Sequence, residues 1–277
     1  GCRLVGKTRL SGEFRKFVSH LYRFLKPLFV PLPLMMSYRL VIDTGNTATK
    51  VSLFSGDEWV RTELFASWTP AEVDALLSKV SVEAAIYSTV AASDPALADY
   101  MRSRIARFHQ FTSETRLPVT LGYRTPSTLG RDRIAAVVGA MLSVPGQDVL
   151  VIDAGTTITY DLLTGDGCFR GGNIAPGIQA RLRSLQRETG RLPLVSAEGD
   201  VPLLGYDTPT AIRAGVVRGV IYEIEGIVEE LSQLYPSLFV FLTGGDALQL
   251  SANVKSRIFV DRNLVPKGLN RILYDNV

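Results

Sequence analysis

The chain has 277 residues, of which 46% are hydrophobic and 21% charged, a composition typical of a globular protein with room for two domains. Only two cysteines are present, Cys2 and Cys168, which excludes a disulfide framework and a cysteine-based zinc site and is typical of a reducing cytoplasm. The two histidines, His20 and His109, lack partners at metal-ligand spacing, so we assign neither of them to a site.

The positive charge of the chain is concentrated at its N-terminus. Residues 1–35 hold seven Lys or Arg and one Glu, a net charge of +6. Because the whole chain has a net charge of +3, the remaining residues carry −3. A body this mildly acidic gives no reason to expect a nucleic-acid surface. The apolar part of the basic block is too short and too interrupted by proline to cross a membrane, and it lacks the order of a signal peptide.

Two interpretations of residues 1–35 remain open. The block is either a basic helix that binds a surface, or sequence upstream of a natural start at Met35 or Met36, and we favour the second interpretation. We therefore expect residues 1–35 to lie outside the fold and a chain that starts at Met36 to be active. Residues 1–8, GCRLVGKT, match the phosphate loop of many NTPases. That loop works only between a buried strand and a helix, so we interpret this match as coincidental.

The stretch 38–50, YRLVIDTGNTATK, predicts a buried strand that ends at Asp43 and passes through a tight turn into a second strand. Gly45 lets backbone approach a ligand closely, and the carboxylate of Asp43 can hold a hydrated cation. Asn46, Thr47 and Lys50 offer donors suited to phosphate oxygens. An ordinary hairpin with a polar turn is the alternative for this stretch taken alone.

The same pattern recurs at residues 149–163, VLVIDAGTTITYDLL. Asp153 aligns with Asp43 and Gly155 with Gly45, and the alignment also matches Thr159 with Thr49. Two copies predict a duplicated α/β fold, with domains at 36–146 and 147–277 and the ligand held between them.

Further elements follow in chain order from periodicity and capping signals. In the first domain we expect a strand at 58–65, a helix at 70–80, a strand at 84–90, a helix at 94–108 capped by Ser93 or Asp94, a last strand at 118–121 and a helix at 134–142. In the second domain we expect a Gly/Pro loop at 171–178 that leads to a helix ending near Gly190, and then a long helix within 205–233 capped by Thr208 or Thr210. A strand at 239–242 and a terminal helix at 263–275 complete the chain.

Asp132, in the segment 122–133 (GYRTPSTLGRDR), has two interpretations. It is either a carboxylate at a helix start, stabilised by the helix dipole, or a general base beside an anion site formed by Arg131 and Arg133. Gly244 and Gly245 also allow two interpretations. They permit close approach of a flat ligand such as adenosine, or they form a strand-to-helix turn capped by Asp246.

Four motifs in order, DTGNTATK at 43–50, GRDR at 130–133, DAGTTIT at 153–159 and TGGDA at 243–247, resemble those of the type III pantothenate kinases, members of the acetate-and-sugar-kinase and actin superfamily. The resemblance spans residues 38–274. It implies two ribonuclease-H-like domains with the active site between them, and transfer of the ATP γ-phosphoryl to pantothenate. The product, 4'-phosphopantothenate, would be the first intermediate of coenzyme A biosynthesis.

The resemblance also implies a role for each matching residue. Asp132 becomes the general base. ATP and its phosphates are contacted by Asp43, Gly45, Asn46, Thr47, Lys50, Thr156, Gly244 and Gly245, and pantothenate by Tyr123, Gly130, Arg131, Arg133 and Thr208, or Thr210 in place of Thr208. Asp43 would hold Mg²⁺ through water, and Asp153 an activating K⁺ or NH₄⁺. A cytoplasmic homodimer is implied, with no nucleic-acid or membrane partner.

Two rival functions remain. A sugar or acetate kinase of the same superfamily would keep the fold and change the acceptor. An actin-like regulator would bind nucleotide without transferring phosphate, and such a protein would not need Asp132 between two arginines.

Overall fold

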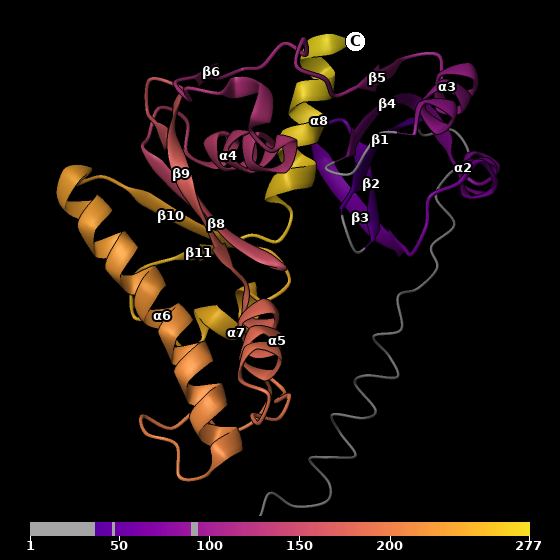
Figure 1. The fold of residues 1–277 in the computed structure, drawn as a ribbon. Coiled ribbons are helices and arrows are strands. Elements are labelled where there is room, and N and C mark those ends of the chain that lie inside the picture. The colour runs from indigo at the N-terminus through magenta and orange to yellow at the C-terminus, as the bar shows by residue number, and fades with distance from the viewer. Residues whose placement is uncertain (1–36, 46–47, 90–93) are drawn as a thin grey trace, which may run out of the picture. The chain divides into compact units, whose positions relative to one another are not determined.

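The computed structural model describes residues 37–45, 48–89 and 94–277, and residues 37–277 form one compact unit (Figure 1). The predictions for residues 1–35 and for Asn46 and Thr47 therefore lie outside the described residues. None of the helices in the described part of the chain is long and apolar enough to span a membrane.

The first sheet has five strands in the order β3-β2-β1-β4-β5. They are β1 (Ser37–Thr44), β2 (Thr49–Ser55), β3 (Glu58–Phe65), β4 (Ser81–Thr89) and β5 (Phe108–Gln110), with α2 (Pro70–Leu77) and α3 (Pro95–Arg104) in the connections. β1 pairs antiparallel with β2 and parallel with β4. Leu40, Val41 and Ile42 of β1 are all buried, because this central strand is covered on both faces.

The second sheet repeats this topology. Its strands are β6 (Thr120–Leu121), β7 (Val149–Ala154), β8 (Thr157–Thr164), β9 (Cys168–Pro176), β10 (Phe239–Thr243) and β11 (Phe259–Val260), in the order β11-β10-β7-β8-β9-β6. β7 pairs antiparallel with β8 and parallel with β10, as β1 does with β2 and β4. Apart from β6, the five strands match those of the first sheet one by one. The predicted duplicated, ribonuclease-H-like α/β fold is confirmed.

Helices cover both faces of the second sheet. They are α4 (Arg131–Ser143), α5 (Ile178–Thr189), α6 (Thr208–Leu234), α7 (Ala247–Ser251) and α8 (Leu264–Asn276), with a short 3₁₀ helix at Pro126–Thr128. Along β7, Val149 and Val151 pack with α4 and α8, whereas Leu150 and Ile152 pack with α5 and α6. Because successive side chains of a strand point to opposite faces, α4 and α6 lie on opposite sides of this sheet.

Close helix packing joins the two sheets. A Cβ atom at Gly139 of α4 would lie 2.1 Å from the Leu264 carbonyl oxygen, and one at Gly268 of α8 would lie 1.8 Å from that of Ala135. Only glycine lets these two helices cross with their backbones in contact. The C-terminal helix α8 also contacts β1 and β4 of the first sheet, so the end of the chain packs against its first half (Figure 1).

Several predicted elements differ from the structure. The helix expected at 94–108 ends at Arg104, and the chain then forms β5 by pairing with β4. The strand expected at 118–121 to complete the first sheet is wrong, since β6 pairs with β9 of the second sheet. The loop expected at 171–178 is mostly strand, because β9 continues to Pro176 alongside β8.

Of the helix caps predicted for α3 and α6, one is confirmed and one is wrong. Asp94 caps α3 through the backbone amides of Ala96 and Leu97, as predicted. The cap of α6 is Asp207, whose carboxylate accepts the Thr210 amide, and not Thr208 or Thr210 as predicted. From the repeated order of the five matching strands we propose halves at 36–146 and 147–277, with β6 of the first half paired to the second sheet.

Candidate active site

The first Asp-Gly turn joins β1 to β2. Asp43 is the next-to-last residue of β1 and pairs in register with Lys50 of β2, and the Gly45 amide closes the turn on the Ala48 carbonyl at 3.1 Å. Burial raises the pKa of Asp43 to about 6. Lys50 lowers this pKa, and the charges of Asp132 and Asp153 raise it.

The second Asp-Gly turn joins β7 to β8 and is one residue shorter. The Gly155 amide donates to the Thr157 carbonyl at 3.0 Å, and Asp153 pairs in register with Thr159. Thr159 is therefore the structural counterpart of Lys50, and the predicted match with Thr49 is wrong by one residue. The second turn thus has no cation at this register position. Burial raises the pKa of Asp153 to about 6, while Lys50 lowers it.

Asp132 lies in the first turn of α4, after Gly130 at the N-cap position. Its Oδ1 accepts the backbone amide of Arg133 at 2.9 Å, and a Cβ atom at Gly130 would lie 2.5 Å from that oxygen. The structure thus agrees with the first-turn interpretation of Asp132. The charge of Asp132 also raises the pKa values of Asp43 and Asp153. The charges of Asp132 and Lys50 therefore act on both aspartates, which lie at the ends of β1 and β7.

The residues predicted to bind pantothenate lie around the same turn of α4, with one exception. Nη1 of Arg131 donates to the Thr89 carbonyl at 3.0 Å, and Gly130 and Arg131 line a cavity of about 330 Å³. The Tyr123 ring lies 5.9 Å from the guanidinium of Arg133. Arg133 itself is buried in an ion pair with Asp161 of β8.

Thr208 is the exception. It is exposed at the start of α6, and α6 and α4 cover opposite faces of the second sheet. Thr210, the other predicted contact, is buried, and its hydroxyl accepts the backbone amides of Tyr206 and Asp207, each at 3.1 Å. Within a single chain, the structure does not bring Thr208 to Asp132.

The predicted ATP residues of the second half surround Asp153. Gly244 has a φ of +94°, and a Cβ atom there would lie 2.2 Å from the Ala154 carbonyl oxygen and 2.5 Å from Oδ1 of Asp153. Only glycine combines this conformation with such a close approach. Gly245 is exposed, and Asp246 occupies the N-cap position of α7 as predicted, but its side chain makes no capping hydrogen bond.

Thr156 belongs to the neighbouring turn, where its carbonyl accepts the amide of Gly177 at 3.1 Å. A Cβ atom at Gly177 would lie 2.1 Å from the Gly155 carbonyl oxygen. The start of α5 therefore rests directly on the turn that carries Thr156.

Three residues at the site escaped the sequence analysis: Asp161, Gly172 and Gly177. The signal for Asp161 was a carboxylate inside the apolar run ITYDLL, where a charged residue is expected only with a buried partner. The signal for Gly172 and Gly177 was the frequent glycine after Phe169. The atoms that require a glycine at 172 belong to other segments of the chain, so the sequence does not reveal them.

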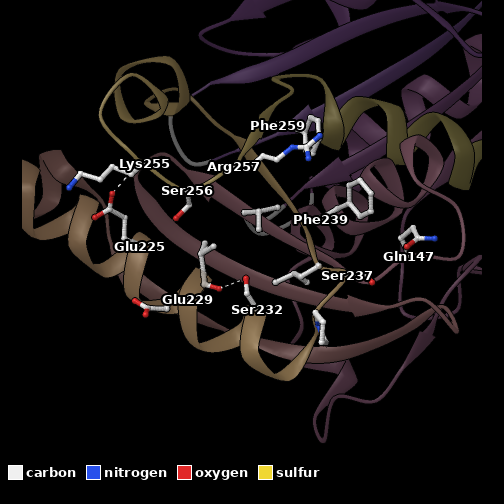
Figure 2. A pocket seen from close by; sticks show the side chains of 14 residues that line it. Gln147, Glu225, Glu229, Ser232, Ser237, Phe239, Lys255, Ser256, Arg257 and Phe259 are labelled. Atoms are coloured by element: carbon white, nitrogen blue, oxygen red, sulfur yellow. Dashed lines mark hydrogen bonds between the residues drawn. The ribbon is translucent and has the colours of Figure 1, made fainter.

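A separate cavity of about 770 Å³ lies between the C-terminal part of α6 and strands β10 and β11 (Figure 2). It is lined by acidic, basic and apolar groups together, including Glu225, Glu229, Lys255 and Phe259. None of the predicted site residues lines it, so this cavity is separate from the candidate active site.

The carboxylates fit a cation shared with a ligand. Within residues 37–45, 48–89 and 94–277, no three histidine, cysteine, aspartate or glutamate side chains are placed to hold a metal ion by themselves. Mg²⁺ usually keeps several waters and binds through one or two carboxylates together with substrate phosphates. Burial is the main cause of the raised pKa values of Asp43 and Asp153, and a bound cation would stabilise the ionised form of both carboxylates.

Asp43→Asn is expected to stabilise the protein at pH 7.5. The folded pKa of about 6 lies above the ordinary value of 3.8, so burial of the carboxylate costs stability that is absent below pH 3.8 and complete above pH 6. Asparagine cannot ionise and avoids this cost, which is at most about 3 kcal/mol. Urea unfolding at pH 7.5 should show the gain, and the gain should shrink as the pH falls towards 4. An Asp43→Asn chain less stable than wild type at pH 7.5 would contradict this, and Asp99→Asn, at an exposed position of α3, is the control.

Comparison with known proteins identifies the family. The family model described as type III pantothenate kinase matches residues 39–230. The type III pantothenate kinase of Bacteroides fragilis is 47% identical over 238 residues, which cover 86% of this chain and 98% of that protein. The corresponding protein of Phocaeicola vulgatus is 44% identical over 237 residues, covering 86% and 98%, and that of Porphyromonas gingivalis is 38% identical over 245 residues, covering 87% and 100%.

Two solved structures with the same fold, both more distant in sequence, are also similar to this chain. A conserved Campylobacter jejuni protein named for the Baf family of transcriptional activators superposes with a TM-score of 0.56 at 23% identity, covering 86% of this chain and 98% of its own. The ethanolamine utilization protein EutJ of Carboxydothermus hydrogenoformans gives a TM-score of 0.50 at 16% identity, covering 87% and 90%. At these identities the likeness concerns the fold alone. The sequence match over most of both chains, with the duplicated fold and its paired Asp-Gly turns, shows that this chain belongs to the type III pantothenate kinase family.

Proposed function

We propose that this protein transfers the γ-phosphoryl group of ATP to the primary hydroxyl of pantothenate. The observation that carries the proposal is the pair of Asp-Gly turns with Asp43 in register with Lys50, in a chain of this family. The charges of Lys50 and Asp132 act on the aspartates of both turns. Phosphoryl transfer mainly requires that the reacting oxygens be aligned and their charge neutralised. A lysine, backbone amides at tight turns and a carboxylate base together meet that requirement.

Each residue of the site has a task in this reaction. The hydroxyl oxygen of pantothenate attacks the γ-phosphorus, the bond from that phosphorus to the β,γ-bridging oxygen breaks, and ADP leaves. Asp132 accepts the proton that the hydroxyl loses. Lys50 balances charge on the transferring phosphoryl group, and the turns at Gly45 and Gly155 let their backbones approach the phosphates. Asn46, Thr47 and Thr156 supply further contacts to ATP in this proposal.

Pantothenate binds beside the start of α4, where Tyr123, Gly130 and Arg131 lie. Asp43 would hold, through water, the Mg²⁺ that accompanies ATP, and that ion would supply neutralisation of the phosphate charge. Asp153 would hold the activating monovalent cation, K⁺ or NH₄⁺. Gly244 and Gly245 let the backbone after β10 lie against the adenosine.

The test of the function is ADP release from ATP and Mg²⁺, with and without pantothenate, in K⁺ and again in Na⁺. We expect turnover that needs pantothenate and is much faster in K⁺. In Asp153→Ala the K⁺ response should be lost while pantothenate dependence persists; an unchanged K⁺ response would remove Asp153 from the cation site. Turnover with a hexose or acetate but not with pantothenate would favour the sugar or acetate kinase. ATP binding without any turnover would favour the actin-like regulator.

We also propose that the protein is a cytoplasmic homodimer. Leu203, Leu204 and Tyr206 are each at least 70% exposed in a loop tied to α6 by Arg213, which donates to the Asp200 carbonyl at 3.1 Å. An apolar group of this kind is typical of an interface. Thr208 lies across the sheet from Asp132 of its own chain. In a dimer formed through this apolar group, Thr208 would instead contact pantothenate bound to the second subunit.

Sedimentation should therefore give twice the 30.3 kDa of one chain. Leu204→Arg is expected to produce monomers with weakened pantothenate binding. Leu64→Arg is the matched control, because Leu64 is 70% exposed on the edge strand β3. Wild-type protein that sediments as a monomer would contradict the dimer.

A further inference from the structure

A buried ion pair connects the first turn of α4 to the second sheet. Nε and Nη2 of Arg133 lie 2.8 and 2.5 Å from Oδ1 of Asp161, and the two side chains are 6% and 0% exposed. Burial lowers the pKa of Arg133, but the hydrogen bond and the charge of Asp161 outweigh it and raise the pKa overall. Two of the guanidinium nitrogens are therefore committed to one buried oxygen.

The surroundings of the pair leave it little freedom to move. The rings of Tyr123 and Phe169 each lie 5.9 Å from the guanidinium carbon of Arg133. Gly172 pairs with Asp161 across β8 and β9, and a Cβ atom there would lie 2.5 Å from Oδ1 of Asp161 and 2.8 Å from Nη2 of Arg133. It would also lie 1.9 Å from the Tyr160 carbonyl oxygen, so the space above the pair exists only because residue 172 is glycine.

The same turn is held on its other side by the first sheet. Arg131 donates to the carbonyl of Thr89, the last residue of β4, at 3.0 Å. Asp132 stands between these two arginines, and its Oδ1 accepts the backbone amide of Arg133 at 2.9 Å. A displacement of the Arg133 side chain would move that amide and with it the carboxylate.

We propose that Asp161 and Gly172 are positioning residues that hold Arg133, and through its backbone amide the Asp132 carboxylate, where the proton of the acceptor hydroxyl is transferred. The inference rests on the proposed kinase function. It also gives Arg133 a different task from the pantothenate contact that the family resemblance implies. An error of about 1 Å in the placement of a catalytic group can lower the rate by about a hundredfold, so this support has measurable consequences.

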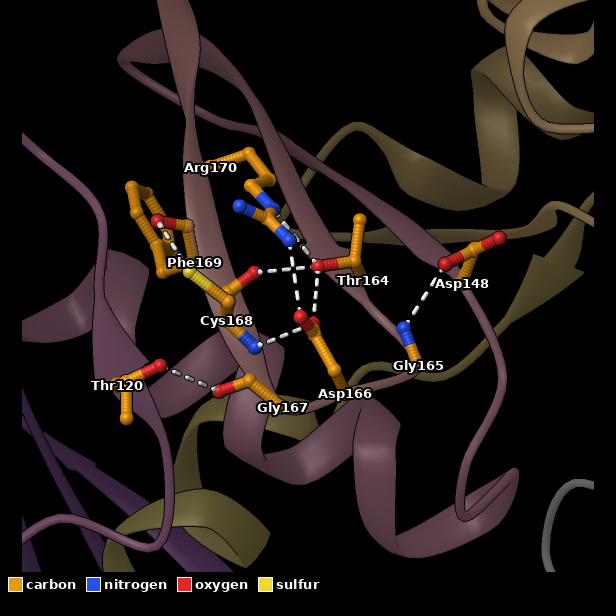
Figure 3. A network of polar contacts seen from close by, with 9 residues as sticks. All are labelled: Thr120, Asp148, Thr164, Gly165, Asp166, Gly167, Cys168, Phe169 and Arg170. Carbon is orange, nitrogen blue, oxygen red and sulfur yellow. Dashed lines mark hydrogen bonds and ion pairs between the residues drawn. The ribbon is translucent and has the colours of Figure 1, made fainter.

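The test must separate positioning from stability. Removing one member of a buried ion pair leaves an unpaired charge and destabilises strongly, whereas replacing both members by neutral groups is often tolerated. We therefore compare Asp161→Asn and Gly172→Ala with the double variant Arg133→Gln/Asp161→Asn. The control is Arg170→Gln/Asp166→Asn, which removes an exposed ion pair of the β8–β9 hairpin with an N···O distance of 2.9 Å (Figure 3).

Steady-state kinetics with both substrates and thermal unfolding are measured on every variant. We expect kcat to fall at least about tenfold in all three test variants, with KM for pantothenate and ATP within about threefold of wild type. The double variant should regain most of the thermal stability that Asp161→Asn loses, without regaining kcat. The control should match wild type in kcat, in both KM values and in thermal stability.

Two kinetic outcomes would overturn the inference. A double variant that regains both stability and kcat would make the pair merely structural. A KM for pantothenate raised more than about tenfold at normal kcat would make Arg133 a substrate contact.

A readout that needs no turnover keeps the inference separate from the proposed function. Hydrogen exchange of the backbone amide of residue 133 should be slow in wild type and in the control, and faster in the test variants. Wild-type protein without pantothenate-dependent turnover would defeat the function alone, and unchanged exchange would defeat the positioning role.

Discussion

Asp132→Asn is expected to lower turnover by about two orders of magnitude or more while ATP binding is retained. The substitution keeps the shape of the side chain and an oxygen that can accept the Arg133 amide, but it removes the group that takes the hydroxyl proton. The measurement is kcat from pantothenate-dependent ADP release, with ATP affinity from calorimetry.

Asp99→Asn is the matched control, since Asp99 is an exposed aspartate of α3 and should leave kcat unchanged. Near-normal turnover in Asp132→Asn would exclude the role of general base. The carboxylate would then serve the start of α4 alone, as the first-turn interpretation holds.

Lys50→Met should cause a loss of similar size and should also change the pH dependence of whatever activity remains. Lys50 lowers the pKa of both Asp43 and Asp153, each of which is about 6 with the lysine present. Without that charge both pKa values rise, so the two carboxylates protonate at a higher pH. We therefore expect turnover at least about a hundredfold lower, and a fall in activity on the acid side that begins at higher pH than in wild type.

The pH–rate profiles of wild type and variant provide the measurement. Lys79→Met, which removes an exposed lysine after α2, should reproduce the wild-type profile. An acid limb at the same pH in wild type and Lys50→Met would mean that the lysine does not act on the carboxylates.

The repeated turns explain why much of the fold could be predicted. The runs RLVIDTG and VLVIDAG each combine β-forming apolar residues with an aspartate and, two residues later, a glycine, and these features act over a few neighbouring residues. The third strand at Glu58–Phe65, the Asp94 cap and the end of α5 at Gly190 are local in the same sense. The sequence alone therefore determined the duplication, the central strands and the two aspartates at their ends.

Only the tertiary structure decided which distant segments meet. β6 joins the second sheet because β9 offers it a free edge, and the glycine-rich end of β9 is strand because it pairs with β8. Arg133 pairs with Asp161, which lies 28 positions later in the sequence. Residue 172 must be glycine because a Cβ atom there would collide with side-chain atoms of both. Thr208 is separated from Asp132 because α4 and α6 cover opposite faces of one sheet. Such contacts depend on which apolar surfaces bury each other, and neither periodicity nor capping within one segment encodes that choice.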